Sequence, residues 1–468
     1  MEKSIQDRYI VEELEGDTLT PILIYQRMSG KKKFLFESSL KHEKSGRYSF
    51  IGADPVMELK GDGNNSIVIT NEGQEIIHEK PLEVLKKLMP EDRMNGFETF
   101  PFCGGAVGYV GYDVIGQYED IGRIPKDELN VPDVHFLFFE DIAVFDHLEQ
   151  KVHLVATPVK SNTDIDALKQ RIVKRNAEIK NGATGKNSED SRLSAFKAST
   201  PKEDFIEKVK KAKEYILEGD IFQVVLSQRL QATMDGDPFS FYRKLRVQNP
   251  SPYMYYLDFE DYAVAGTSPE SLIKATDGKV TTNPIAGTRP RGKSELEDEQ
   301  LEKDLQEDEK ELAEHRMLLD LGRNDLGRVC EFGSVQIEKY MKIEKYKHVM
   351  HLVSEVGGKL KEPNSAIDAL ISCLPAGTVS GAPKIRAMEI INELEDVKRG
   401  IYSGAVGYFS ANGNMDFALT IRTMIIKDQK AYIQAGAGIV HDSIPEKEYE
   451  ETIHKLKAFL GGQDDLTY

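Results

Sequence analysis

The stretch TPKEDFIEKVKKAKEYILEGDIFQVVLS, residues 200–227, decides the fold class because its pattern changes from helix to strand. Thr200 and Glu203 have the spacing of a capping box, with a proline between them at the first helical position. Gly219 predicts the end of that helix, and the apolar run 221–226 predicts a strand directly after it. The sequence therefore interleaves helices with strands from this point onward.

Short strand patterns dominate the part of the chain that precedes this stretch. Strands are predicted at 33–37, 47–51, 66–70 and 75–78, and again further on at 253–259, with helices at 81–89 and 164–180. Strands first, followed by strands interleaved with helices, predict an α/β or α+β chain that contains large sheets.

Residues 181–191 form the one obvious low-complexity break, and their composition is typical of a flexible linker. We therefore expect an N-terminal region over 1–180, a linker over 181–199 and a catalytic region over 200–468. The pentapeptide Gly-Ala-Val-Gly-Tyr occurs at 105–109 and again at 404–408. Five residues do not establish a repeat, so two independent glycine-rich strands are the favoured interpretation.

The composition excludes several classes of protein. A formal net charge of -17 disfavours nucleic acid or an anionic membrane as the main partner, because both would repel the surface on average. Cys103, Cys330 and Cys373 are too few and too scattered for a disulfide framework or a zinc site. The start of the sequence lacks an apolar signal core, and no stretch has the length of a membrane span. A reduced, cytoplasmic enzyme is expected.

Two acidic pairs are candidate ligands for a metal ion. Glu311 and Glu314, like Glu448 and Glu451, are spaced i, i+3, so on helices both carboxylates of each pair share a face. Four carboxylates from two distant segments could form an all-oxygen site, which suits Mg²⁺. Taken alone, the first pair lies in an acidic run over 295–314, and such runs are usually solvated helix surfaces.

A series of glycine, carboxylate, arginine and amide clusters surrounds these pairs through the C-terminal half. These clusters are GTSPE at 266–270, PIAGTRPRG at 284–292, LLDLGRNDLG at 318–327, HVMH at 348–351, LPAGTVSGAPK at 374–384, YSGAVGY at 402–408 and QAGAG at 434–438. In these motifs the chain resembles the chorismate-utilising enzymes, and specifically the large subunits of anthranilate synthases, over nearly its whole length. The resemblance implies large antiparallel or mixed sheets in a two-layer, sandwich-like arrangement flanked by helices.

The resemblance also implies an activity and assigns roles to residues. Such enzymes convert chorismate and ammonia to anthranilate and pyruvate, the first committed step of tryptophan biosynthesis. By resemblance, Mg²⁺ is held by Glu314 and Glu451, with Glu311 and Glu448 beside them or acting through water. Glu270 is the general acid for the C4 hydroxyl, and His351 lies near the substrate ring. The expected substrate contacts are Thr288, Tyr402, Arg422, Lys455 and the backbone N–H groups of Gly436 and Gly438.

Several of these residues also have a plain structural interpretation. The pair Glu451 and Lys455 has the spacing of an ordinary helix ion pair, which contributes only tenths of a kcal/mol. Arg422 could serve a structural ion pair, and the glycines could serve strand packing. His348 and His351 share a face if their stretch is helical, but zinc is improbable because it would require a third ligand in a softer environment. Within the resemblance, His348 is assigned a structural role.

The residues at two positions distinguish among the reactions that members of the family catalyse. Members that add water at C2 carry a lysine base where this chain has Gln223, so isochorismate and salicylate synthesis are disfavoured. Many aminodeoxychorismate synthases carry a nucleophilic lysine where this chain has Ala286, so attack of ammonia at C2 is favoured. Aminodeoxychorismate synthase, which serves the folate pathway, stays the alternative. A scaffold or tryptophan sensor without activity ranks far lower, because the proposed site residues are all present.

The resemblance further implies feedback control and a partner subunit. Glu37, Ser38, Pro252, Tyr253 and Met254 are similar to the segments that bind inhibitory tryptophan, although Phe36 replaces a leucine of the usual motif. No glutaminase module is recognisable, since none of the three cysteines has a nucleophile-elbow context. We therefore expect a separate glutamine amidotransferase subunit, component II, to supply the ammonia.

Overall fold

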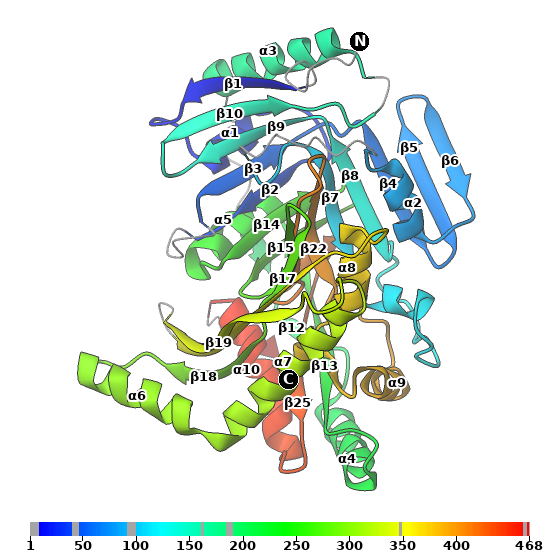
Figure 1. Ribbon diagram of the computed structural model, residues 1–468, viewed down its shortest axis with the longest axis vertical. Helices are drawn as coiled ribbons and strands as arrows, with labels where there is room; N and C mark the ends of the chain where they lie inside the picture. Colours follow the sequence, from blue (N-terminus) through cyan, green and yellow to red (C-terminus); the bar gives the residue numbers. More distant parts are fainter. Residues whose placement is uncertain are drawn as a thin grey trace.

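Two large β-sheets face each other, and helices cover their outer faces (Figure 1). The computed structural model describes residues 9–39, 46–90, 100–160, 163–183, 191–345, 349–461 and 466–467. All strand pairs in both sheets are antiparallel, except for the short pair β12 and β26. The predicted fold class, with large sheets flanked by helices, is therefore confirmed.

The first sheet has 14 strands within the described ranges. Its main path runs β1 (Ile10–Glu15), β10 (Lys151–Ala156), β9 (Asp141–Asp146), β3 (Tyr48–Gly52), β2 (Phe34–Glu37), β14 (Tyr253–Asp258), β15 (Tyr262–Ser268), β24 (Thr423–Lys427), β25 (Lys430–Ile439), β13 (Gln223–Asp235), β12 (Phe196–Ala198) and β26 (Leu466–Thr467). Two short strands, β11 (Arg192–Leu193) and β21 (Gly381–Ala382), pair with β13 beside this path.

The second sheet has 12 strands, counted over the same part of the chain. Its path runs β18 (Ile285–Pro290), β20 (Val349–Lys359), β17 (Lys279–Thr282), β16 (Ser271–Thr276), β23 (Met415–Leu419), β22 (Ala405–Ser410), β7 (Gly105–Val110), β8 (Val134–Phe139), β4 (Met57–Asp62), β5 (Asn65–Thr70) and β6 (Gly73–Ile77). Strand β19 (Gln336–Lys345) pairs with β20 beside the path.

Helices pack on the outer face of each sheet. The first sheet buries apolar side chains against α1 (Pro21–Arg27), α3 (Ile165–Asn181), α4 (Lys202–Glu218), α5 (Pro238–Gln248), α9 (Lys384–Leu394) and α10 (Pro445–Phe459). The second packs against α2 (Pro81–Leu88), α7 (Glu309–Gly327) and α8 (Ala366–Cys373). Helix α6 (Glu295–Glu307) and the 3₁₀ turns η2 (Tyr112–Gln117) and η3 (Gly377–Val379) complete the described elements.

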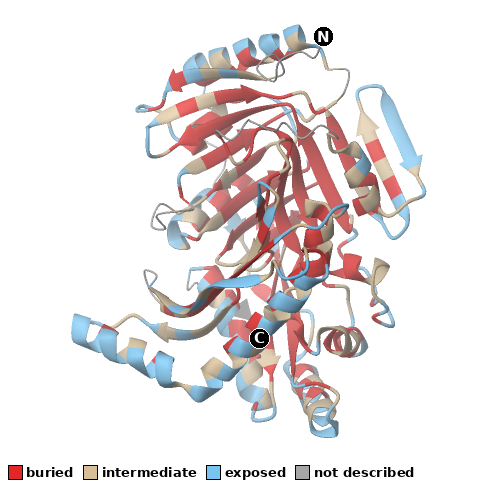
Figure 2. Cartoon of the chain, in the orientation of Figure 1, coloured by how far each residue is buried: buried red, intermediate tan, exposed pale blue. Residues whose placement is uncertain are grey.

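The strands of the two facing sheets are mostly buried (Figure 2). The core between the sheets is rich in aromatic rings. Strand β8 has the sequence VHFLFF, and all six of its residues are buried. Side chains alternate between the two faces of a strand, so both faces of β8 are covered. Phe136 and Phe138 face the helices, whereas Leu137 and Phe139 face the opposite sheet. Ring contacts such as Phe34 on β2 with Phe139 on β8, at 4.7 Å between centroids, join the two layers.

N-terminal and C-terminal strands lie side by side in both sheets. Strand β2 pairs with β14 in the first sheet, and β7 pairs with β22 in the second. The two copies of the glycine-rich pentapeptide are therefore neighbours, with Gly108 directly opposite Gly407. A Cβ at either glycine would lie within 2.0 Å of a backbone oxygen of the adjoining strand, so close backbone approach explains both. The division into regions 1–180 and 200–468 stays a prediction.

Three local predictions need correction. The capping box is wrong, because Pro201 occupies the N-cap of α4 and no side chain caps this helix, although Gly219 does end it with φ 86°. The strand predicted at 221–226 is longer and begins at Gln223, since its polar second half pairs with β25 along its length. His351 lies on a strand, not a helix. Residues 184–190 of the predicted linker, and His348, lie outside the described residues.

Candidate functional site

A cavity of about 210 Å³ lies between β13 and β25, turn η3, the connection from β23 to β24, and α10. Six of the predicted site residues line it, although they are spread over almost two hundred positions of the sequence. These six are Glu270, Tyr402, Arg422, Gly436, Gly438 and Lys455. The chain thus brings the expected acid together with the expected substrate contacts except Thr288, which is not among the residues that line this cavity.

Glu270 occupies the turn between β15 and β16, at the wall of this cavity. Its carboxylate accepts a hydrogen bond of 2.8 Å from the hydroxyl of Thr378. Burial raises the pKa of Glu270 to about 7, because the protein around it disfavours the charged form, while Thr378 and Arg422 oppose that shift. The carboxyl group can therefore hold a proton near neutral pH, as a general acid must.

Arg422 lies in the short connection between β23 and β24, in the left-handed region with φ 49°. Non-glycine residues adopt this conformation at an energetic cost and often do so at functional sites. Its side chain is exposed at the cavity, and desolvation by the surrounding protein lowers its pKa while Glu270 raises it. A guanidinium held in this way is suited to bidentate binding of a carboxylate.

Two glycines of β25 leave space beside Tyr402 and Gln223. A Cβ at Gly436 would lie 3.0 Å from the Tyr402 hydroxyl and equally close to a backbone oxygen of β13, so a side chain does not fit there. A Cβ at Gly438 would meet only the amide of Gln223, at 2.8 Å. Lys455 donates a 2.9 Å hydrogen bond to the carbonyl of Gly436, so it ties α10 to this strand. It also forms the expected ion pair with Glu451, at 2.8 Å.

The four predicted metal carboxylates lie on α7 and α10, as their spacing implies. Burial raises the pKa of Glu314, and the negative charges of Glu311 and Glu451 raise it further. Burial and Glu451 likewise raise the pKa of Glu448. The side-chain amide of Gln223 lies 3.4 Å from Glu314 and links these carboxylates to the cavity. The two helices therefore present their acidic faces to one another.

This set of oxygen ligands fits Mg²⁺ in kind, because hard cations favour carboxylates. The carboxylates are not drawn together, however: in the described part of the chain no three of them have ligand atoms within 4.8 Å of one another. Mg²⁺ stays a prediction that the donor chemistry supports.

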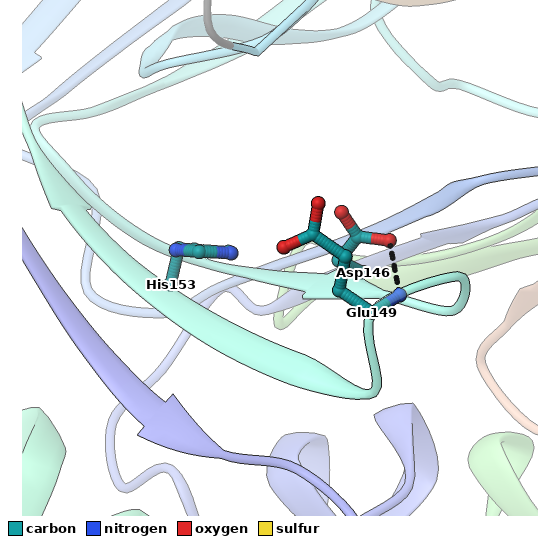
Figure 3. Close-up of side chains that lie close together, drawn as sticks. All are labelled: Asp146, Glu149 and His153. Carbon is teal, nitrogen blue, oxygen red and sulfur yellow. Dashed lines mark hydrogen bonds between the residues drawn. The ribbon is translucent and has the colours of Figure 1, made fainter.

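One compact group of possible ligands lies elsewhere, at Asp146, Glu149 and His153 (Figure 3). Arg47 forms ion pairs with both carboxylates of this group: its guanidinium lies 2.7 Å from Asp146 and 2.8 Å from Glu149. Asp146 also accepts bonds from the backbone N–H groups of Leu148 and Glu149. An arginine, two carboxylates and a tight turn explain the group without a metal ion.

Thr288 and His351 face each other across a β-bulge. Strand β18 shifts register between Ala286 and Thr288, and Gly287 has φ 69° at the extra residue. The ring nitrogen Nδ1 of His351 lies 3.0 Å from the Thr288 hydroxyl and 3.1 Å from the carbonyl of Gly287. Burial lowers the pKa of His351, and Arg422 lowers it further, so the imidazole is neutral near pH 7.

The five residues predicted to bind an inhibitor line a second cavity, of about 260 Å³. Ser38 is the best placed of them, because its buried hydroxyl has no hydrogen-bond partner among the residues described. Glu37 is engaged elsewhere: its carboxylate accepts bonds of 2.7 Å from Tyr242 and from Arg246 on α5. The other three predicted residues are Pro252, Tyr253 and Met254.

Sequence reasoning missed several residues of the two cavities. Thr378 lies within a motif that resemblance had singled out, so a signal for it existed, although no role was assigned. Asp416 in the second cavity accepts a 2.9 Å bond from the Tyr253 hydroxyl and lies 3.6 Å from Lys274. No local sequence signal marks Asp416 or Lys274, because only the pairing of β16 with β23 brings them together.

Known proteins are similar to this chain over nearly its whole length. A family model described as chorismate binding enzyme matches residues 31–461. Anthranilate synthase component 1 of Acetivibrio thermocellus is 48% identical over 465 residues, which cover 96% of this chain and 94% of that protein. The same component of Lactococcus lactis is 46% identical over 455 residues, covering 96% and 98%.

Solved structures extend the comparison to three dimensions. The crystal structure of anthranilate synthase component I from Streptococcus pneumoniae TIGR4 superposes with a TM-score of 0.83 at 46% identity, covering 95% of this chain and 98% of that one. The menaquinone-specific isochorismate synthase of Escherichia coli has a TM-score of 0.74 at 17% identity, over 97% and 94% of the two chains, which shows a common fold.

No helix in the described ranges is both long and apolar enough to cross a membrane.

Proposed function

Because this chain belongs to the family of chorismate binding enzymes, and within it to the anthranilate synthase component 1 proteins, we propose that it converts chorismate and ammonia to anthranilate, pyruvate and water. The observation that carries the proposal is the cavity that holds Glu270, with its pKa of about 7, beside Arg422. An acid and a carboxylate anchor on one small cavity are what the departing hydroxyl and the enolpyruvyl carboxylate require.

In the first step ammonia attacks C2 of the ring, both ring double bonds shift by one position, and the bond from C4 to its hydroxyl oxygen breaks. Glu270 gives its proton to that oxygen, which leaves as water. Tyr402 and Arg422 bind the enolpyruvyl carboxylate, and the N–H groups of Gly436 and Gly438 donate further bonds. Burial raises the pKa of Tyr402 to about 12, so the phenol stays protonated and can donate.

In the second step the ring loses the proton at C2, and the bond from C3 to the enolpyruvyl oxygen breaks. Enolpyruvate takes up a proton at its methylene carbon and leaves as pyruvate, and the ring becomes aromatic. We assign acceptance of the C2 proton to His351, which is neutral because burial lowers its pKa and which is near enough to Arg422 for that cation to lower the pKa further. Thr288 holds this imidazole at 3.0 Å.

Glu314 and Glu451 would hold Mg²⁺ directly, with Glu311 and Glu448 beside them or acting through water. When bound, the ion polarises the ring carboxylate and offsets negative charge in the transition state. Lys455, paired with Glu451 at 2.8 Å, supplies a positive charge next to these carboxylates.

Two side chains favour amination at C2 over the alternatives. Gln223 cannot take a proton from water, so addition of water at C2 lacks a base. Ala286 offers no amine for a covalent route to 4-amino-4-deoxychorismate, and that alternative is not favoured by the relatives named above. Because most ammonia is protonated at neutral pH, a component II glutaminase would supply it.

Identification of the product tests the proposal directly. The purified chain is incubated with chorismate, Mg²⁺ and an ammonium salt at raised pH, and the products are separated by chromatography. Anthranilate and pyruvate in equal amounts are expected. Isochorismate, salicylate or 4-amino-4-deoxychorismate as the main product would overturn the assignment.

The second cavity supports tryptophan as an inhibitor. An amino acid carries one cation and one carboxylate, and this cavity offers the Asp416 carboxylate, the Lys274 ammonium group and the unpaired Ser38 hydroxyl. Tyr48, Phe50 and Tyr408 supply aromatic walls on which an indole can pack. Calorimetry with L-tryptophan tests the site, and Ser38→Phe, which fills the space, should abolish binding.

A further inference from the structure

Arg399 is a buried cation at the back of the catalytic cavity, and the chemistry described above gives it no role. Its side chain is 1% exposed and forms a 2.7 Å ion pair with Glu395, which is also buried. A buried ion pair of this kind contributes little to the stability of the fold, because desolvation offsets most of the attraction. The contacts of Arg399 show what else the pair does.

All five N–H donors of the guanidinium have acceptors. Nε and Nη2 donate to the two carboxylate oxygens of Glu395, at 2.9 and 2.7 Å. Nη2 also donates to the carbonyl of Val225 at 2.6 Å, and Nη1 donates to the carbonyl of Val379 at 2.7 Å. A longer bond of 3.5 Å runs from Nη1 to the hydroxyl of Ser403. These five hydrogen bonds fix the guanidinium in one orientation.

The acceptors of Arg399 are walls of the catalytic cavity. Val225 on β13 and Val379 in η3 both line it, and the Arg399 guanidinium lies 5.8 Å from the ring centre of Tyr402, which lines it too. Val379 directly follows Thr378, whose hydroxyl donates to Glu270. The path from Arg399 to the general acid therefore contains two hydrogen bonds, joined by one turn of 3₁₀ helix.

Glu395 extends the same framework to another wall. It accepts bonds from the backbone N–H and the hydroxyl of Ser227, at 2.8 and 2.9 Å. The Ser227 hydroxyl in turn accepts a 2.8 Å bond from Gln434, which lines the cavity. Arg399 and Glu395 together thus fix the strand, the turn and the tyrosine that surround the substrate space.

Resting on the proposed function, we propose that Arg399 is a positioning residue for the reaction: through the carbonyl of Val379 it holds Thr378 against the general acid Glu270. Arg399 does not touch the substrate space itself. Loosening it would move η3 away from β16 and release the Thr378 hydroxyl from the Glu270 carboxylate.

A released Thr378 has a measurable electrostatic signature. Its hydrogen bond favours the ionised form of Glu270, so losing that bond raises the pKa of the acid above about 7. The other charged or titratable groups at this site are Arg422, Tyr402 and Lys455 on the same cavity, and His351 next to Arg422. None of these contacts Arg399 through a hydrogen bond. Tyr402 lies 5.8 Å from its guanidinium, and a lysine at position 399 keeps the positive charge there.

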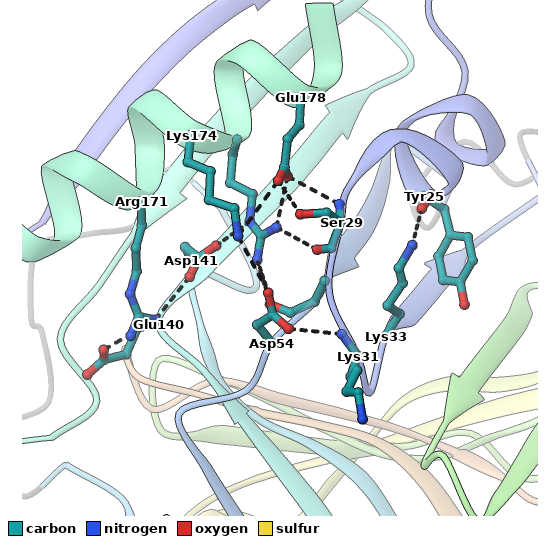
Figure 4. A network of polar contacts seen from close by, with 12 residues as sticks. Tyr25, Ser29, Lys31, Lys33, Asp54, Glu140, Asp141, Arg171, Lys174 and Glu178 are labelled. Carbon is teal, nitrogen blue, oxygen red and sulfur yellow. Dashed lines mark hydrogen bonds and ion pairs between the residues drawn. The ribbon is translucent and has the colours of Figure 1, made fainter. Parts of the chain in front are cut away.

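Arg399→Lys is the test, because lysine keeps the charge opposite Glu395 but cannot reach both carbonyls at once. Arg175 offers a matched control, since it is 3% exposed and is also a buried hub. It donates to Asp141 and Glu178 and to the carbonyls of Ser29 and Ala53, at 2.8 to 2.9 Å. Figure 4 shows this network beside α3. Arg175 lines neither of the two cavities.

Activity of both variants is measured from pH 6 to 9.5 at a constant concentration of free ammonia. We expect Arg399→Lys to lower kcat by about 10- to 100-fold, with a smaller change in KM, because misplaced catalytic groups affect turnover more than binding. The alkaline limb of its kcat/KM profile should move to higher pH. Thr378→Val should move the limb in the same direction, and the double variant should move it no further. Arg175→Lys should change the melting temperature alone.

A second readout does not depend on turnover. Carboxyl ¹³C NMR of glutamate-labelled protein, with the Glu270 signal assigned through Glu270→Gln, reports the titration of Glu270 directly. A raised midpoint in Arg399→Lys supports the proposal even if the reaction differs from that proposed. An unmoved midpoint, or an equal displacement in Arg175→Lys, overturns it. Where Arg399→Lys does not fold, Glu395→Gln loosens the same guanidinium and takes its place in both measurements. Wild-type protein that forms no anthranilate refutes the proposed function alone.

Discussion

At the scale of single residues, Glu270 shows how the fold makes a reactive group from a common one. A glutamate in a polar turn is normally ionised at neutral pH. Here burial alone moves the pKa to about 7, although a hydroxyl and an arginine both act in the opposite direction. The sequence indicated this residue through its motif, but burial, which sets the pKa, arises only from the packing of η3 and the β23–β24 connection around it.

Replacing Glu270 by glutamine should lower kcat by about 10²- to 10⁴-fold, the usual contribution of general acid catalysis. The amide keeps the shape and the Thr378 contact, so chorismate affinity measured by calorimetry should change little. A rise in KM at unchanged kcat would instead make Glu270 a binding residue.

The same substitution should change how stability depends on pH. The pKa of Glu270 is raised from 4.5 in the unfolded chain to about 7 in the folded protein, so its neutral form stabilises the folded state. That contribution is fully present below pH 4.5 and is lost as the pH rises through 7. The melting temperature of the wild type relative to Glu270→Gln should therefore fall from pH 5 to pH 8. A constant difference would mean that the pKa is not raised.

Glu314 and Glu451, which we propose as Mg²⁺ ligands, allow a third test at this scale. Glu314→Gln and Glu451→Gln should each abolish turnover and weaken Mg²⁺ binding measured by calorimetry, because each would remove a ligand worth several kcal/mol in the transition state. Glu309→Gln and Glu450→Gln, which are exposed on the same two helices, serve as controls and should bind Mg²⁺ normally. Normal Mg²⁺ affinity in the first pair would refute the proposed site.

At the scale of elements, the helices and strands that the sequence predicted lie near their observed bounds. Periodicity sufficed for α3, β5 and β14, because these elements have one clear apolar face or a continuous apolar run. It failed at His351, since a half-buried strand and a helix both accommodate the local pattern. The bulge in β18 could not be predicted either, because a register shift depends on the partner strand.

That bulge gives a prediction of its own. Gly287→Ala places a Cβ at φ 69° and 2.9 Å from Leu305, so it should cost about 1 kcal/mol or more in stability and displace the carbonyl that contacts His351. Gly278→Ala is the matched control, with φ 78° and open space around the new Cβ. Thermal unfolding should show both losses, whereas only Gly287→Ala should lower anthranilate formation. Equal activity in the two variants would contradict a role for the bulge.

At the scale of the whole molecule, the two cavities are neighbours across the first sheet. Tyr255 lines the second cavity, Thr423 lines the catalytic one, and their hydroxyl groups lie 2.5 Å apart. The fold offers a short route for coupling between the two cavities, because β14, β15 and β24 are adjacent strands.

Tyr255→Phe should therefore weaken the coupling between tryptophan and chorismate. It removes one hydroxyl and leaves the other residues that line the two binding sites unchanged. Such couplings are typically ~1–3 kcal/mol and are reciprocal, so each ligand should lower the affinity of the other less than in the wild type. Calorimetry of each ligand with and without the other measures this. Ser38→Phe provides the contrast, because it should remove tryptophan binding itself. Undiminished coupling in Tyr255→Phe would exclude the hydroxyl pair as the route.

The pairing of β2 with β14 and of β7 with β22 constrains the order in which the chain can fold during synthesis. Strand β14 leaves the ribosome roughly 200 residues after β2, which at about 5–20 residues per second is ten seconds or more. During that interval the apolar strands of the first half have open edges. Nascent chains should therefore need protection by chaperones until their second half arrives, and expression of residues 1–180 alone should yield aggregate.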